Sequence, residues 1–437
     1  MREMKDSGIS WIGEIPKEWN KRPIRSIIKS RVGGVWGDDI NDDIQGVVCI
    51  RIADFDFSKR KIKDVSSDLL TYRLYNSIQI QKYSLQKNDI LIEKSGGGEK
   101  TPVGRAVLFD KNYKALFANF MDRIRIDDSI VLPVFAEYWL WNLYSCRVTP
   151  YYINQTIGIQ NIDLTFMLAK EKICFPSLVE QQRIAEFLDR ECGKIDGLEA
   201  DIQAQIDTLE QYKRSVITEA VTHGLNPSAP MKDSGAGWMP LIPLHWKADK
   251  LKFHLRQRGI KNQIDKQVLS LYREYGIVPK DSRDDNHNVT SEDVSDYRYV
   301  RVGDFVVNKM KAWQGSVAVS NYEGIVSPAY FVYEFSDDLI NKRYFHYLMR
   351  NKTYATEFRR LSGGIREGQW DLPSEALNNT IILLPPLDEQ QEIADYLDNK
   401  CAEIEQIIAD KESQIETLDG YKKSLIYEYV TGKKEVG

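Results

Sequence analysis

Two stretches of the chain carry hydrophobic residues at a seven-residue spacing within otherwise polar sequence. The first stretch has this spacing at Leu188, Ile195, Ile202, Leu209 and Val216. The second has it at Leu397, Ile404, Leu418 and Leu425. A companion row is expected at Ile184, Leu198 and Tyr212, and at Ile393, Ile407 and Tyr421. A narrow apolar seam on a long polar helix is typical of a coiled coil.

A helix with so narrow a seam needs a partner to bury it. About 45 residues at about 1.5 Å each make a rod of roughly 65–70 Å. Because the chain has two such helices, we expect them to pair antiparallel with each other. Packing of each helix on its own globular domain is the alternative. Gln205 and Lys411 interrupt the seams, and polar seam residues often fix register.

The two helical stretches also repeat each other in sequence. PSLVEQQRIAEFLD begins at Pro176 and PPLDEQQEIADYLD at Pro385, and the alignment continues without a gap to Thr222 and Thr431. A second phrase repeats as MKDSGISWIGEIPKEW and MKDSGAGWMPLIPLHW. Solenoid repeats have periods of about 20–50 residues, so this chain is a duplicated long unit with an approximate twofold relation between its halves.

Between the repeated phrases lie two blocks with mixed patterns. Short β-branched runs bounded by Gly, Asp or Asn predict strands. These runs are QGVVCIRIADF, NDILIEKS, GRAVLFD and FMDRIRI in the first block, and KQVLSLYRE, GDFVVNKM, GSVAVSN and SPAYFVYEF in the second. PVFAEYWLWNLYS and NKRYFHYLMRN predict aromatic helices. The expected fold class is mixed α/β (α+β), with two globular domains separated by two long antiparallel coiled-coil helices.

This pattern divides the chain into seven parts. They are an opening segment 1–19, a first globular domain 20–175, a central helix 176–224, a linker with the repeated opening 225–245, a second globular domain 246–384, a distal helix 385–431 and a tail 432–437.

Charge is distributed unevenly over these parts. The whole chain of 437 residues has a net charge of −5, but 176–224 carries −5 and 385–431 carries −8. The blocks 20–175 and 246–384 carry +5 and +3. Two mildly basic blocks permit DNA binding, since the footprint that matters is a local patch.

Cysteine spacing and hydropathy bear on location. The five cysteines show no paired spacing, which predicts neither disulfides nor a metal framework and fits a cytoplasmic protein. Cys192 and Cys401 occupy equivalent helix positions and are expected in the core. No apolar run of about 18 residues exists and the first residues lack a signal core, so no membrane association is expected.

A glycine-rich loop, KSGGGEKTPVGR, follows a predicted strand in the first block. It lacks the spacing of a P-loop. Its glycines could let backbone approach a phosphate beside flanking cations. The candidate DNA-binding residues here are Lys94, Ser95, Gly97, Lys100 and Arg105. A surface loop without a ligand is the alternative.

Three further loops hold candidates for reading bases, because Arg pairs with guanine and Asn or Gln with adenine. INQTIGIQNIDL supplies Asn154, Gln155 and Gln160. KMKAWQGS supplies Lys309 and Lys311, which could meet phosphates, and Trp313 and Gln314, which could reach base edges or stack. RRLSGGIREGQWDL supplies Arg360, Arg366 and Gln369. Solvated loops would explain the same residues one by one.

Catalytic motifs are missing from the sequence. The amino-methyltransferase pattern N-P-P-[FY] is absent, no G-x-G follows a strand, and five His residues show no ligand spacing. The sequence therefore predicts a non-enzymatic chain without a metal or cofactor of its own.

The duplicated P-[SP]-L-x-E-Q-Q-x-I-A-x-[FY]-L-D and Y-K-[RK]-S-[VL]-I-x-E-x-V-T, with KDSG at the opening of each half, closely resemble the DNA-specificity subunit of type I restriction-modification systems. The resemblance covers almost the whole chain. It implies two target-recognition domains, each reading one half of a split double-stranded DNA target, held apart by paired helices.

The same resemblance implies that the helices dock two methyltransferase subunits, and that a translocating endonuclease subunit can join. S-adenosylmethionine, ATP and Mg²⁺ would belong to those partners. Candidate docking residues at the helix starts are Glu180, Gln181, Gln182, Glu389, Gln390 and Gln391. A stand-alone coiled-coil adaptor and a DNA-binding regulator without enzyme partners are the alternative classes.

Overall fold

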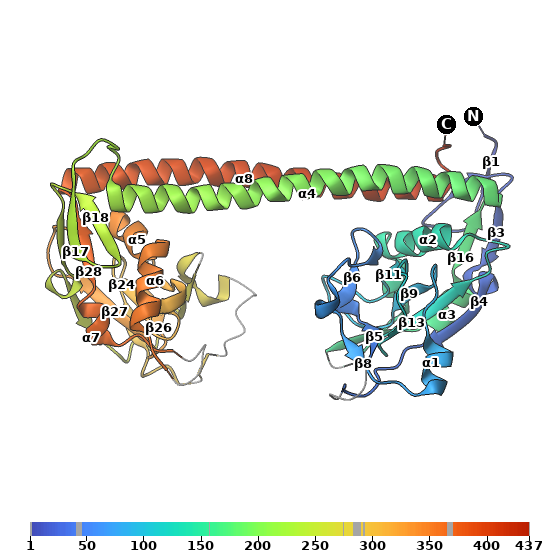
Figure 1. The fold of residues 1–437 in the computed structure, drawn as a ribbon, viewed down its shortest axis with the longest axis horizontal. Helices are drawn as coiled ribbons and strands as arrows, with labels where there is room; N and C mark the ends of the chain where they lie inside the picture. The colour runs from blue at the N-terminus through green and yellow to red at the C-terminus, as the bar shows by residue number, and fades with distance from the viewer. Residues whose placement is uncertain are drawn as a thin grey trace. The chain divides into compact units, whose positions relative to one another are not determined.

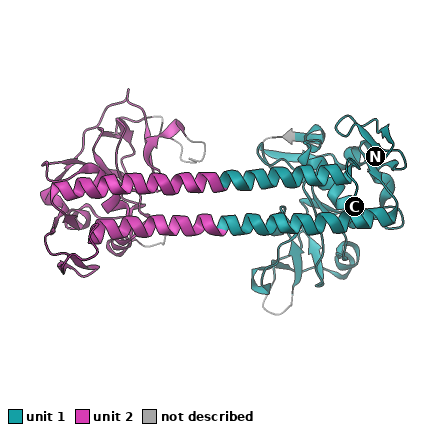
Figure 2. Cartoon of the chain, turned by 90° about the horizontal axis from the view of Figure 1, so that it is seen from above, with its two compact units in different colours: residues 1–203, 412–437 teal, residues 204–411 magenta. Residues whose placement is uncertain are grey.

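The structure is a computed structural model that describes residues 2–40, 46–156, 158–273, 275–282, 290–291, 293–364 and 370–436. The chain forms two compact units (Figure 2). Unit 1 comprises Met1–Gln203 and Glu412–Gly437, and unit 2 comprises Ala204–Lys411. Each unit holds one globular domain and a part of each long helix.

The two long helices are present as expected (Figure 1). Helix α4 spans Leu178–His223 with 46 residues, and helix α8 spans Leu387–Val430 with 44 residues. Acidic residues occupy both first turns, Glu180 in α4 and Asp388 and Glu389 in α8. Negative charge near the positive helix N-terminus is stabilising. No helix in the described part of the chain is long and apolar enough to cross a membrane.

Cross-helix contacts inside each unit show that α4 and α8 pair antiparallel. In unit 1, Phe187 of α4 stacks on Tyr429 of α8 with ring centroids 4.4 Å apart. In unit 2, Lys411 Nζ of α8 donates to Gln205 Oε1 of α4 at 2.5 Å, and Lys213 of α4 pairs with Glu405 of α8. The predicted pairing is confirmed, and the two polar seam residues meet each other.

The predicted second row of the seam is confirmed only at Ile184 and Ile393, which are 2% and 0% exposed. Leu198 and Tyr212 are 52% and 48% exposed, and Ile407 and Tyr421 are exposed as well. The row that is turned inward lies four residues after each member of the first row. Its members include Cys192, Glu199, Ile206 and Lys213 in α4, and Cys401, Ile408, Ile415 and Lys422 in α8. Lys213 and Lys422 form ion pairs across the helices, so a search for apolar residues alone selects the wrong row.

The domain of unit 1 is built around an antiparallel centre. Strand β13 (Met121–Ile126) lies between β4 (Ile28–Gly33) and β9 (Ile90–Glu93). The sheet continues through β11 (Ala106–Leu108), β7 (Lys61–Ile62) and β6 (Phe55–Asp56). A second sheet joins β12 (Ala115–Phe117), β5 (Val47–Ile50) and β8 (Tyr72–Arg73). The helices are α1 (Ser77–Tyr83), α2 (Pro133–Ser145) and α3 (Leu164–Lys170).

The domain of unit 2 repeats the central arrangement with fewer strands. Strand β27 (Tyr330–Phe335) lies between β20 (Leu255–Arg258) and β24 (Phe305–Asn308), which also pairs with β25 (Val317–Val319). Strands β21 (Leu269–Tyr272) and β22 (Gly276–Pro279) form a hairpin, and β23 (Arg298–Val300) pairs antiparallel with β26 (Gly324–Val326) across the intervening β24 and β25. The helices are α5 (Lys342–Arg350), α6 (Lys352–Leu361) and α7 (Ser374–Asn378). The eight predicted strands and two aromatic helices are all present.

Each repeated opening forms a hairpin. The pairs are β1 (Met4–Asp6) with β2 (Glu14–Pro16), and β17 (Met231–Ala236) with β18 (Met239–Pro243). The chain then pairs β3 (Asn20–Pro23) with β16 (Lys172–Phe175), and β19 (Lys247–Lys250) with β28 (Ile381–Leu384). Tyr427 of α8 donates its hydroxyl to Trp11 O at 3.2 Å, so the first hairpin meets the last turns of α8. The second hairpin shares a core cluster with Val221 of α4. The opening of each half therefore packs on the ending of the other half.

The core of each unit runs from its domain into the long helices. In unit 1, Trp139 of α2, Leu188 of α4 and Leu425 of α8 belong to one buried cluster. In unit 2, Phe345 of α5, Val221 of α4 and Leu397 of α8 do the same. Cys192 and Cys401 are buried free thiols, as expected. The domains are thus continuous with the helices through buried apolar side chains, which favour a fixed orientation within each unit.

Candidate nucleic-acid interface

In unit 1 the two candidate loops come together in one small sheet. Strand β10 (Ser95–Gly96) pairs with β15 (Ile159–Ile162), which pairs with β14 (Ile153–Thr156). Ile162 N donates to Lys94 O at 2.9 Å, and Ser95 Oγ donates to Asn161 Oδ1 at 2.6 Å. The segments that carry Lys94 and Asn154 are therefore one surface, although they lie far apart in sequence.

The candidate loops of unit 2 meet in a comparable way. Leu372 N donates to Lys309 O at 2.9 Å, and Lys309 Nζ pairs with Asp371 at 2.9 Å. Trp313 packs on Trp370 with ring centroids 5.6 Å apart. In both units the lysine that follows a central strand accepts a backbone hydrogen bond from the second loop. The two domains thus present equivalent loop pairs with different side chains.

Several candidates of unit 1 are held by the protein itself. Arg105 donates to both oxygens of buried Glu93 at 2.9 and 3.1 Å, and its guanidinium lies 3.6 Å from the centre of the Phe57 ring. Lys94 pairs with Asp122 at 2.9 Å. Gln160 is buried and its Oε1 accepts from Val103 N at 3.3 Å. A DNA contact by any of these three would require breaking an internal contact.

The remaining candidates of unit 1 face solvent. Lys100, Gly97 and Asn154 are exposed, and Ser95 is partly so. Gln155 lies in strand β14, and its side chain is outside the described residues. Lys100 and Asn154 are therefore the candidates of this unit that are best placed to meet a phosphate and a base edge.

In unit 2 the exposed candidates are Lys311, which precedes the short helix η7 (Ala312–Gln314), and Gln314, the last residue of that helix. Trp313 donates its indole N–H to Met310 O at 3.0 Å, so its polar atom is occupied. Arg360 donates to both oxygens of Glu357 at 2.7 Å. Arg366 and Gln369 lie outside the described residues.

Two exposed aromatic residues of unit 1 are not among the candidates predicted from the sequence. Phe120 is 47% exposed, and its carbonyl accepts from the backbone N–H groups of Lys94 and Ser95. Tyr151, just before β14, is 86% exposed. Exposed aromatic faces beside a nucleic-acid surface can stack on bases. Their exposure depends on the tertiary fold, and the sequence gives no signal that separates them from core aromatics.

The docking candidates at the helix starts divide into two kinds. Gln181 is buried: its Oε1 accepts from Leu132 N at 2.8 Å and its Nε2 donates to Pro176 O at 3.0 Å. Gln390 is buried in the same way: its Oε1 accepts from Asn341 N at 2.8 Å and its Nε2 donates to Leu339 O and Pro385 O, each at 2.9 Å. The amides of both residues fasten the domain to the helix, so neither is presented to a partner.

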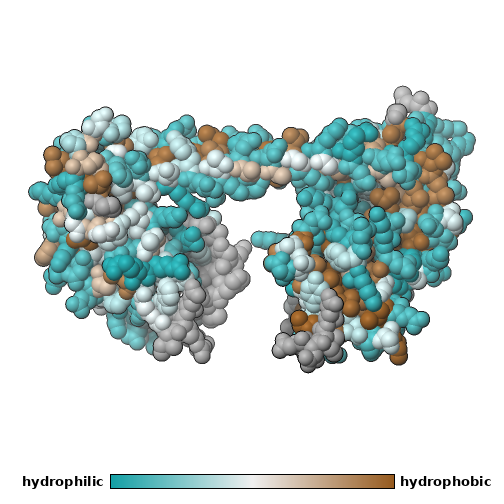
Figure 3. Space-filling model, in the orientation of Figure 1, coloured by the Kyte–Doolittle hydropathy of each residue, from teal (hydrophilic) through white to brown (hydrophobic). Residues whose placement is uncertain are grey.

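The other docking candidates are more accessible. Glu180 pairs with Arg2 at 2.5 Å, and Glu389 accepts from His245 Nε2 at 2.7 Å and Trp246 Nε1 at 3.0 Å. Gln182 donates to Glu186 at 2.7 Å. Gln391 donates to Asp395 at 2.9 Å and accepts from Asn341 Nδ2 at 2.6 Å. Docking through these four residues stays a prediction. On the face drawn in Figure 3, hydrophobic residues are scattered among hydrophilic ones along the long helices.

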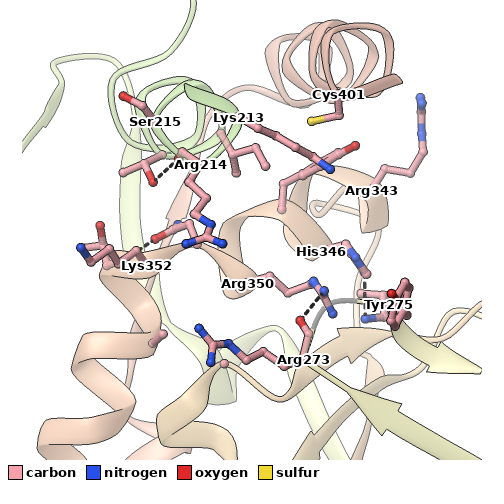
Figure 4. A pocket seen from close by; sticks show the side chains of 18 of the residues that line it. Lys213, Arg214, Ser215, Arg273, Tyr275, Arg343, His346, Arg350, Lys352 and Cys401 are labelled. Atoms are coloured by element: carbon pink, nitrogen blue, oxygen red, sulfur yellow. Dashed lines mark hydrogen bonds between the residues drawn. The ribbon is translucent and has the colours of Figure 1, made fainter. Parts of the chain in front are cut away.

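Unit 2 also contains a cleft of about 1980 Å³. Helices α4 and α8 line one side of it, and α5, α6 and the turn between β21 and β22 line the other (Figure 4). Gln314 and Arg360 border this cleft, so it adjoins the candidate loops of unit 2. Among the described residues, no group of three or more His, Cys, Asp or Glu is placed to hold a metal ion.

Comparison with known proteins identifies the class to which these features belong. Residues 16–208 and 260–417 match the family model described as type I restriction modification DNA specificity domain. The chain belongs to this family. Each matched segment covers most of one globular domain and most of the long helix that follows it.

Particular relatives agree with the family. The chain is 23% identical over 441 residues to a protein of Methanocaldococcus jannaschii named "Putative type I restriction enzyme MjaX specificity subunit", covering 97% of this chain and 96% of that protein. It is 27% identical over 323 residues to the type I restriction enzyme MjaVIII specificity subunit of the same organism, covering 68% of this chain and 70% of that protein.

A solved structure shares the fold. A chain from a study of complex assembly and conformational transition of the type I R-M system superposes with a TM-score of 0.65 at 13% identity, covering 96% of this chain and 99% of that chain. At this sequence identity the structural similarity supports a shared fold only. That fold has two globular domains and two long helices.

Proposed function

We propose that this chain is the DNA-recognition subunit of a type I restriction-modification complex, and that each globular domain reads one half of a bipartite target. One observation carries the proposal. In both units, the backbone carbonyl of the lysine after a central strand, Lys94 or Lys309, accepts a hydrogen bond from a second loop. The exposed side chains of these loops differ between the two units. Equivalent frameworks with unlike loops suit two unlike half-sites.

The experiment is methylation mapping. The full chain is expressed with the methyltransferase subunit that copurifies with it, and methylated bases are mapped in the host DNA. The expected motif has two specified halves separated by an unspecified spacer. Replacing residues 246–384 with the corresponding block of a relative should change one half only. A motif that ignores this exchange, or methylation without any motif, would refute the proposal.

The chain is proposed to be non-catalytic and to carry no cofactor. The exposed candidates in the described part of the chain are cations, amides and aromatic side chains, which can bind and position nucleic acid. S-adenosylmethionine, ATP and Mg²⁺ are assigned to partner subunits. Purified chain incubated with S-adenosylmethionine and diverse DNA should transfer no methyl group above background, and robust transfer would contradict this assignment.

Two methyltransferase subunits are proposed to dock on the long helices, with an endonuclease subunit joining them. Support comes from the repeat: the exposed pairs Leu198 with Ile407 and Tyr212 with Tyr421 occupy equivalent helix positions, so the chain offers one surface twice. Copurification at two methyltransferase subunits per chain is expected. A chain that binds DNA with sequence preference but copurifies with no methyltransferase would instead be a regulator.

A further inference from the structure

The cleft of unit 2 has an excess of positive charge. Its lining includes eight Lys and Arg side chains and five Asp and Glu side chains. Four of the five carboxylates are already paired with cations of the same lining: Glu210 with Arg214, Glu357 with Arg360, Asp398 with Arg343, and Glu405 with Lys213. The remaining carboxylate, Glu219, lies 3.7 Å from His223 Nδ1. The acidic residues of the lining therefore do not neutralise its other cations.

Three of those other cations are exposed and form no ion pair with a carboxylate in the described part of the chain. They are Arg273 in the turn between β21 and β22, Lys342 at the start of α5 and Lys352 at the start of α6. Lys342 Nζ lies 5.4 Å from the centre of the Phe335 ring, a weak contact that leaves its charge available. Figure 4 shows Arg273 and Lys352 bordering the same open space as Arg214 of α4.

The two lysines occupy positions that the helices themselves disfavour. Lys342 and Lys352 lie in the first turns of α5 and α6, and neither first turn contains an acidic residue. A cation at the positive end of a helix is repelled by the helix dipole. The side chains of Asn341 and Asn351 already accept hydrogen bonds from the N–H groups of these turns. An anion bound here would therefore be held by the lysine side chains and not by the helix N–H groups. Bound negative charge would remove the repulsion.

The shape of the cleft indicates which anion fits. A small anion needs several donors that converge on one point, whereas these cations come from three different elements and line one side of a large, open cleft. A sugar–phosphate backbone carries charges at regular intervals and can meet such a row. The exposed candidate Gln314 lines the cleft, and Lys311 lies just before it in the same candidate loop.

We propose that this cleft binds the sugar–phosphate backbone of DNA next to the second half-site, with Arg273, Lys342 and Lys352 as phosphate-positioning residues. The inference rests on the proposed function and adds the location of a sequence-independent contact. Phosphate contacts fix the register of a protein on DNA and carry no base information. The contact would hold the duplex while the loops beside Gln314 read the bases.

The test compares two triple variants of the full chain, alone and in the complex in which it purifies. R273Q/K342Q/K352Q removes the cleft cations. R256Q/K247Q/K250Q is matched in charge and residue type and replaces exposed residues of the same unit that do not border the cleft. Binding is measured from low to moderate salt on target DNA and on DNA with a scrambled second half-site. Circular dichroism verifies that both variants are folded.

The cleft variant should lose about two to three units of the slope of log affinity against log salt, because each phosphate contact contributes about 0.9. Affinity should fall by the same factor on target and scrambled DNA, so the sequence preference stays unchanged. The matched variant should keep the slope of the unmodified chain.

Two outcomes would overturn the inference while the proposed function stands. One is a cleft variant that binds target DNA with the same affinity and salt slope as the matched variant. The other is a cleft variant that binds DNA normally but loses a partner subunit, which would make the cleft a protein-binding site. If the unmodified chain binds no DNA with sequence preference in either form, the proposed function fails and the inference with it.

Discussion

Lys422 of helix α8 forms an ion pair with Asp196 of helix α4 while only 2% of its side chain is exposed. Its Nζ also donates to Ser58 O at 2.8 Å, in the loop between β6 and β7 of the domain. The corresponding residue of the first half is Lys213, which pairs with Glu405 across the same two helices, but with 27% and 63% of the side chains exposed. The repeat thus contains one buried and one solvated version of the same contact.

This pair of contacts yields the first prediction. Lys422→Met leaves Asp196 and Ser58 O without their partner, and loss of one member of a buried pair typically costs about 3–5 kcal/mol. Lys213→Met should cost less than about 1 kcal/mol, because exposed pairs contribute little. Urea unfolding monitored in each unit measures both variants. Equal losses for the two substitutions would contradict the difference in burial.

The second prediction concerns the buried glutamines at the helix starts. Gln181→Ala and Gln390→Ala each leave buried backbone groups without partners, which typically costs about 1–3 kcal/mol. Gln182→Ala is the matched control, and it should change the free energy of unfolding by less than about 0.5 kcal/mol because its amide is exposed. The rate of amide hydrogen exchange around Leu132 should increase in Gln181→Ala and stay unchanged in Gln182→Ala and Gln390→Ala. Unchanged exchange there would argue against the fastening role.

The third prediction separates phosphate from base contacts in the first domain. Lys100→Ala should weaken binding to all sequences and reduce the salt slope by about one. Asn154→Ala should cost about 1–3 kcal/mol on the target and relax one position of the first half-site. Both effects are read by binding selection from a randomised DNA library. The second half-site should stay unchanged in each variant, and a change there would show that the domains do not read independently.

The fourth prediction uses the continuity of α4 and α8. Inserting four residues after Ala200 and four after Ala409 adds roughly 6 Å of helix at about 1.5 Å per residue. Because one base pair spans about 3.4 Å, the spacer between half-sites should grow by one or two base pairs while both half-sites persist. Methylation mapping of the double insertion gives the answer. An unchanged spacer in an active complex would mean that the helices do not set the distance.

The fifth prediction concerns pH. Burial, reinforced by the charge of Arg350, lowers the pKa of His346 to about 4, and its Nδ1 accepts from Val319 N at 3.3 Å. The folded state therefore favours neutral imidazole, and the unfolded state, with a pKa of about 6.5, binds the proton more readily. The free energy of unfolding should be fully retained above about pH 6.5 and fall by about 1–3 kcal/mol as pH drops to about 4. His346→Gln should reduce this dependence in pH-dependent urea titrations, and an unchanged profile would contradict it.

Repeated phrases and periodicity were sufficient to predict the long helices, their antiparallel pairing and the strands of both domains. The same reasoning failed at Leu198 and Tyr212, because the seam contains charged residues whose partners lie on the other helix. It also assigned Gln181 and Gln390 to a docking surface. Leu132 N and Asn341 N donate hydrogen bonds to these two side chains in the fold. The sequence does not indicate these contacts, because the partners lie far apart along the chain.

At the candidate interface, the sequence predicted the candidate loops, but not which of their side chains are free to contact DNA. The joining of Ser95 to Asn161 depends on strand pairing between segments 66 positions apart. Arg105 and Arg360 are natural candidates by residue type, yet each forms a bidentate pair with a nearby glutamate. Local charge in a sequence cannot distinguish a cation that binds DNA from one that braces a strand or a helix.

The opening of each half packs on the helix that ends the other half, and this affects when each unit can fold during synthesis. Unit 2 is one continuous segment, Ala204–Lys411, so all of its parts leave the ribosome before those of helix α8 that belong to unit 1. Residues 412–437 belong to unit 1, and Leu425, Ile426 and Val430 of α8 share its buried cluster with residues of the first hairpin and α2. Although the first domain is translated first, it cannot complete its core until the end of α8 has emerged. A chain interrupted before that point would contain the candidate DNA-binding loops of both domains but would leave apolar surface of the first domain exposed. Such a surface is the kind that quality-control proteases and chaperones bind.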